Sequence, residues 1–237
     1  MSEVFSAFHK GLRDIFVPRV LAMVLAPILC ALALWMLVGW LFWAQFTAWV
    51  SGGLMSSQAG QWVADYSQGV LQFGATLIAL ALLAPCMLIT AMVITELVTM
   101  PALVNHVAAH DHPMLARLHG GTVAGGIANA LIAIVIFGVL WIVTLPLWFT
   151  GIGALIVPVL NSAYLSQRVF RHDALADHAS PEELQALNTA NRRTLFALGL
   201  VTAVFFYVPV VNLLAPAFTG LAFTHFQLGR LAKLRQK

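Results

Sequence analysis

The sequence predicts an all-α, polytopic helical membrane protein with two long spans and one or two helical hairpins, the last of them re-entrant. Of the 237 residues, 61% are hydrophobic and only 9% are charged, and the mean hydropathy is +0.90. A soluble domain carries about 25% charged residues. No charged residue occurs in 20–64, 66–95, 118–167 or 194–229. Each stretch can hold at least one helix of the roughly 20 residues that cross a bilayer.

Residues 1–19 are expected to form an amphipathic helix at the membrane surface. Apolar side chains recur at helical spacing from Val4 to Phe16, with Lys10, Arg13 and Asp14 among them. A frayed polar tail is the alternative.

Residues 20–110 are expected to hold two transmembrane helices, at 20–43 and 70–94. The stretch between them, at about 45–69, is polar but contains no Lys or Arg, and tryptophans flank it. That composition is typical of an outside loop with an aromatic belt.

The sequence of residues 118–167 predicts a helical hairpin with a bend near Gly151. Its first arm, 122–144, measures roughly 34 Å at 1.5 Å per residue and is long enough to cross, whereas the second is shorter. Whether the pair crosses fully is left open. Residues 168–193 then form a cytoplasmic connector, in which Ser180-Pro181-Glu182-Glu183 is a capping box that starts a helix.

Residues 194–230 are interpreted as a re-entrant helical hairpin, followed by a basic tail at 231–237 that suits anionic headgroups. Pro209 breaks the helix near the middle, which leaves arms of about 15 residues, or roughly 22 Å. Irregular backbone at membrane depth has to be buried in protein or line a wet cavity. Two short spans in a thinned bilayer are the alternative.

All twelve Lys and Arg residues fall on one side of the membrane in this topology. The positive-inside rule then places both termini in the cytoplasm. We therefore expect a multi-pass protein of the bacterial inner membrane.

Two polar residues in the last hairpin are pathway candidates, together with the prolines Pro209 and Pro216. Asn212 lies between these prolines, where broken helices of transporters expose polar groups; alternatively it only satisfies the turn. His225 lies in the returning arm, where a histidine is a functional candidate unless it simply reaches the inner interface.

No cofactor, metal or nucleic-acid partner is predicted. His106 and His110 share a helix face, but no third ligand follows at a motif spacing. No catalytic triad or dinucleotide fingerprint occurs, so we expect no enzyme.

The last apolar stretch contains Val208-Pro209-Val210-Val211-Asn212, followed by Pro216. It resembles the I-P-x-x-N-x-x-x-P signature of the CysZ/etoposide-induced-protein family. Pro18 and Pro27 match that family's paired prolines, and residues 5–13 and 161–174 resemble its first helix and the helix before its cytoplasmic turn.

This resemblance implies a bacterial inner-membrane transporter or channel for a small anion, sulfate or similar, and a homo-oligomer is expected because one protomer encloses little. The sulfate-handling relatives carry Gly-Leu-Arg-Arg after the first proline, whereas this chain has Arg19-Val20-Leu21-Ala22. Arg19 and Arg13 are therefore the anion-binding candidates. The missing arginine pair favours the alternative, a non-transporting membrane scaffold or assembly factor.

Overall fold

The computed structural model describes residues 2–208 and 211–236, and helices without any strand make up the regular structure of those residues. The protein is an all-α polytopic membrane protein. The elements in chain order are α1 (Ser2–Ile15), α2 (Pro18–Met55), α3 (Gln58–Tyr66), α4 (Gln68–Ile94), a π-helical turn (Thr95–Thr99), α5 (Met100–Asp111), α6 (Val123–Trp148), α7 (Ile152–Ala176), α8 (Pro181–Ala190), α9 (Arg192–Ala203), two 3₁₀ turns (Val204–Tyr207 and Val211–Leu213) and α10 (Ala215–Arg235).

Three helices in the described part of the chain are long and apolar enough to cross a membrane. They comprise Pro18–Met55, Gln68–Met87 and Ala124–Trp148. Their side chains are mostly exposed, including large apolar ones such as Leu37, Leu77 and Ile142. Exposed apolar surface of this extent is what a lipid environment requires.

The chain forms two compact units, and residues Leu25–Leu97 make up one of them. Here Val50 of α2 belongs to the same buried apolar cluster as Ala75 and Ala79 of α4. The indole of Trp35 donates a hydrogen bond to the hydroxyl of Thr90 over 3.1 Å.

The stretch 45–69, expected as a loop, is mostly helical. Its hydroxyl groups bond back to the preceding turn of their own helix, as Thr47 does to the carbonyl of Trp43 and Ser51 to that of Ala48. Polar residues satisfied in this way do not have to end a helix. The polarity of the stretch therefore did not produce an open loop.

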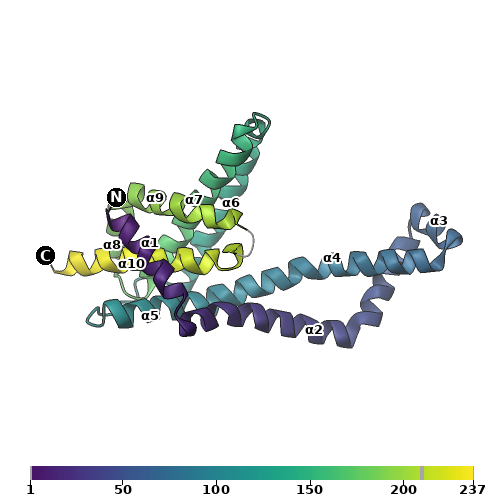
Figure 1. The fold of residues 1–237 in the computed structure, drawn as a ribbon, viewed down its shortest axis with the longest axis horizontal. Helices are drawn as coiled ribbons and strands as arrows, with labels where there is room; N and C mark the ends of the chain where they lie inside the picture. The colour runs from purple at the N-terminus through teal and green to yellow at the C-terminus, as the bar shows by residue number, and fades with distance from the viewer. Residues whose placement is uncertain (1, 209–210, 237) are drawn as a thin grey trace. The chain divides into compact units, whose positions relative to one another are not determined.

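The second unit combines Met1–Val24 with Val98–Lys237, and α10 is its central helix. Helices α1, α5, α7, α8 and α9 all pack against α10, and Figure 1 shows α1 lying across it. Residues from Ala217 to Leu228 of α10 are buried without interruption. Phe218 packs with Leu103 and Val107 of α5, and Phe223 packs with Leu195 and Leu198 of α9.

Glycines set the closest helix crossings in this unit. A Cβ placed on Gly199 of α9 would lie 2.6 Å from the carbonyl oxygen of Ala163 in α7. A Cβ on Gly11 of α1 would lie 3.1 Å from the backbone nitrogen of Ala222 in α10. Backbone atoms cannot move aside as a flexible side chain can, so both crossings depend on the absence of a side chain.

The hairpin of α6 and α7 turns through residues 149–151, where Gly151 adopts a φ of 73°. Only glycine reaches this region without strain. Helix α7 then continues past Gln167 to Ala176, so it joins the expected hairpin to the expected connector without a break.

We predict that Gly199→Ala destabilises the protein by about 1–3 kcal/mol, because the added methyl group overpacks the α7–α9 crossing. Thermal unfolding in detergent micelles measures this change. Gly229→Ala in α10 is the matched control, since a Cβ there meets nothing within 4 Å. Equal unfolding midpoints for the two variants would show that the crossing is not tight.

Candidate anion site

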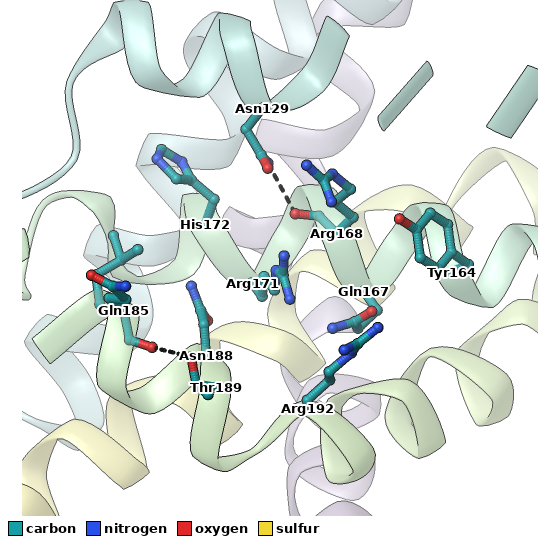
Figure 2. Close-up of a pocket in the computed structure, with 11 residues that line it drawn as sticks. Asn129, Tyr164, Gln167, Arg168, Arg171, His172, Gln185, Asn188, Thr189 and Arg192 are labelled. Carbon is teal, nitrogen blue, oxygen red and sulfur yellow. Dashed lines mark hydrogen bonds between the residues drawn. The ribbon is translucent and has the colours of Figure 1, made fainter. Parts of the chain in front are cut away.

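A cavity of about 460 Å³ lies where α7, α8 and α9 meet the first turns of α6. Figure 2 shows the polar side chains that line it, with three arginines among them. The lining residues are Asn129, Tyr164, Gln167, Arg168, Arg171, His172, Leu184, Gln185, Asn188, Thr189 and Arg192.

Helix α7 supplies a polar stripe to the cavity. Tyr164, Gln167, Arg168, Arg171 and His172 follow one another at intervals of three and one residues, which places them on one face of an α-helix. The stripe follows directly on the apolar half of α7. One helix therefore carries both the hydrophobic arm of a hairpin and the wall of a charged cavity.

Helix α8 supplies the opposite wall through Gln185, Asn188 and Thr189, again at helical spacing. The predicted capping box that starts α8 is confirmed: the hydroxyl of Ser180 accepts from the backbone N–H of Glu183, and the Glu183 carboxylate accepts from the backbone N–H of Ser180.

Arg235, at the end of α10, holds the start of α8 in place. Its guanidinium donates to both carboxylate oxygens of Glu183, at 2.9 and 2.7 Å, and to the backbone carbonyls of Ala116 and His178. The hydrogen bond from Arg235 lowers the pKa of Glu183 below its ordinary value. This bidentate pair fixes the turn from which α8 extends along the cavity.

Gln227 of α10 orients Asn188. The Gln227 amide is fully buried and donates over 2.8 Å to the side-chain oxygen of Asn188. With its oxygen engaged, Asn188 has its amide N–H groups left to offer as donors. Asn129 of α6 donates over 2.9 Å to the carbonyl of Arg168, which ties the base of α6 to α7.

The lining is rich in positive charge. Arg168, Arg171 and Arg192 all line the cavity, and its eleven lining residues include neither Asp nor Glu. Burial, together with the neighbouring charges of Arg168 and Arg192, lowers the pKa of Arg171. Burial and repulsion thus destabilise the charged form of this guanidinium, and an anion bound in the cavity would stabilise it.

Two of the donors have no acceptor. The Nε of Arg168 and the Nε2 of Gln167 are buried and have no hydrogen-bond partner within the described part of the chain. A buried donor without an acceptor costs free energy of about 1–3 kcal/mol, more when it is charged. The three guanidinium groups of the lining can bind a small oxyanion through charge-assisted hydrogen bonds.

A family model described as sulfate transporter CysZ/etoposide-induced protein 2.4 matches residues 7–216. The chain belongs to this family. The match includes every residue that lines the cavity. No curated protein and no solved structure matched the chain.

The anion-binding candidates named from the sequence of this CysZ-family protein lie elsewhere. The side chain of Arg13 is 71% exposed, and its Nε lies 3.8 Å from Oδ1 of Asp14. Arg19 is exposed in the first turn of α2. Neither residue lines the cavity that contains Arg168, Arg171 and Arg192, which we call the arginine cavity.

Asn212, Pro216 and His225, the pathway candidates that the structure describes, do not line the cavity either. Asn212 is exposed in the second 3₁₀ turn, where its backbone N–H donates to the carbonyl of Val208, and Pro216 is half-buried at the start of α10. Pro209 lies outside the described residues. His225 is buried within the second unit, where its Nε2 lies 2.8 Å from Oδ2 of Asp14.

Sequence reasoning missed the cavity because it treated residues 168–193 as a connector. The available signal was the polar stripe from Tyr164 to His172, which has helical spacing across the boundary between the apolar and polar segments. The pairing of that stripe with α8 and α9 is a tertiary feature that no local pattern contains.

We predict that Glu183→Gln destabilises the protein at neutral pH by roughly 1–2 kcal/mol, because it removes the ion pair with Arg235. Since the pKa of Glu183 is lowered in the folded state, its contribution is present above the ordinary value of 4.5 and disappears as pH falls through the folded-state value. The unfolding midpoints of native and variant protein should therefore differ at pH 7 and converge below pH 4.5. A constant difference across this range contradicts the assignment.

Proposed function

We propose that this protein transports a sulfate-like dianion across the bacterial inner membrane and that the arginine cavity binds the anion on the cytoplasmic side. The observation that carries the proposal is the cavity lined by three arginines and by no carboxylate, in a chain of the CysZ family. We assign the protein no catalytic role.

The chemistry of the lining supports an oxyanion. A guanidinium presents a planar fork of N–H donors that matches two oxygens of a tetrahedral anion. Arg171, Asn188 and Gln167 offer further donors from two facing helices. A fully ionised anion needs donors on all sides, and this lining provides them from α7, α8 and α9.

The orientation in this proposal follows from charge. The cavity lies within the arginine-rich segment that the positive-inside rule places in the cytoplasm, with both termini on the same side. We further propose that the last hairpin is re-entrant, and that a homo-oligomer encloses the pathway.

The proposal also keeps the candidates named from the sequence. The proposed anion-binding residues are Arg13 and Arg19, and the proposed pathway residues are Pro209, Asn212, Pro216 and His225. Arg13 and Arg19 are exposed cations at the start of the chain, suited to attract an anion to the surface. Asn212 between its two prolines is the proposed polar point of the pathway.

Radiolabelled sulfate uptake into proteoliposomes tests the proposal. Removing one charge-assisted donor costs about 1.5–3 kcal/mol, so we expect Arg171→Gln to lower sulfate affinity by roughly 10- to 100-fold. Arg193→Gln is the matched control, because Arg193 is exposed and does not line the cavity. Arg19→Ala and Asn212→Ala, assayed beside it, report on the proposed surface and pathway residues.

Equal losses in Arg171→Gln and Arg193→Gln would show that general positive charge, and not the cavity, accounts for uptake. No uptake by folded, inserted native protein would overturn the transport proposal. A protein partner that co-purified with such inactive protein would favour a membrane scaffold.

A further inference from the structure

A second group of charged residues lies apart from the arginine cavity, where α1, α5 and α10 meet. Lys10 and Asp14 come from α1, Asp111 from the end of α5, and His225 from α10. The Nε2 of His225 lies 2.8 Å from Oδ2 of Asp14, and its Nδ1 lies 3.4 Å from Oδ2 of Asp111. Lys10 donates to that same Asp111 oxygen over 2.7 Å.

These residues are unusually buried for charged groups. The exposed fraction of the side chain is 3% for His225, 10% for Asp14 and 20% for Asp111, whereas Lys10 is half exposed. Isolated charges at such depth are costly, and pairing is what makes them tolerable. The charge of each of these four side chains therefore depends on the other three.

Each ring nitrogen of His225 lies within 4 Å of a carboxylate oxygen, and only Nε2 is hydrogen-bonded, to Asp14. A neutral imidazole has a single N–H, whereas an imidazolium has two. If the single hydrogen is on Nε2, the ring donates it to Asp14. The lone pair of Nδ1 is then close to the negative oxygen of Asp111. That Nδ1 is buried without a hydrogen-bond partner among the described residues. A second proton on Nδ1 turns this repulsion into an attraction.

Apart from the exposed Arg13, the charges of the cluster balance when the ring is protonated. Lys10 offsets one of the two carboxylates, and the imidazolium offsets the other. Burial works against a charge on the ring, whereas the carboxylates of Asp14 and Asp111, each close to one ring nitrogen, stabilise it.

Other charges near the cluster are peripheral. Arg13 lies 3.8 Å from Asp14 but its side chain is 71% exposed, and His112 is the neighbour of Asp111 in the chain. Among the described residues, α7, α8 and α9 place no carboxylate within ion-pair distance of His225.

We propose that His225, Asp14 and Asp111 form a proton-binding site that fastens α1 and α5 to α10. The bound proton adds the link to Asp111, whereas the neutral ring keeps only the link to Asp14. Helix α1 also carries Phe8, which packs against Phe205 and Phe218 on either side of the turn before α10. The site thus controls how firmly α1 is held against α10. This inference does not depend on the proposed transport of sulfate.

The test uses the full chain in lipid nanodiscs and two readouts. Nitrogen NMR of histidine-labelled protein at pH 6 should show, beside the signals of the exposed histidines, a doubly protonated ring that is lost in His225→Gln. Thermal unfolding should show a midpoint rise from pH 8 to pH 6 that is larger in the native protein than in His225→Gln by about 2–4 °C.

His9→Gln is the matched control, because His9 is an exposed histidine of the same helix α1, and it should retain the native rise. Asp111→Asn provides a milder variant if His225→Gln fails to fold, because it leaves the Asp14–His225 pair; it should abolish the extra rise. A singly protonated His225 ring at pH 6, or an unchanged rise in His225→Gln or in folded Asp111→Asn, overturns the proposal.

Discussion

Lipid hydrocarbon does not accommodate an unpaired charge, and the arrangement of this protein follows from that constraint. The long helices α2, α4 and α6 carry exposed apolar side chains over most of their length. The arginines are consequently confined to the ends of the spans and to the segment after residue 167. Charges gathered in this way repel one another unless something negative lies among them. The residues that line the arginine cavity include three arginines and no carboxylate, so the lining itself does not relieve that repulsion.

A single helix holds both polar sites of this unit in place. On α10, Gln227 orients Asn188 at the arginine cavity, and His225 joins the acidic residues of α1 and α5. Arg235 at its end fixes the start of α8 through Glu183. Because apolar residues such as Phe223 and Leu228 surround these polar groups, each side chain has few alternative conformations. A change in the packing of α10 should therefore affect both sites.

The helical membrane fold and the family could be predicted from the sequence, because both depend on local signals. Stretches without charged residues indicate the membrane spans. The resemblance to the family rests on the prolines on either side of Asn212 and on Pro18 and Pro27 of α2. The capping box at Ser180 is likewise local, since its two hydrogen bonds lie within one turn. The arginine cavity and the His225 cluster join segments distant in sequence. Asp14 and His225, for example, meet only because Gly11 lets α1 approach α10 closely.

Anion density in the arginine cavity would test the central claim most directly. Selenate has the shape and charge of sulfate, and its selenium can be located by anomalous scattering in crystals of the protein. We predict one ordered selenate between Arg168, Arg171 and Arg192, with occupancy that falls when sulfate is added. Ordered selenate at Arg13 and Arg19 with an empty cavity, or an empty cavity at saturating selenate, would contradict the account.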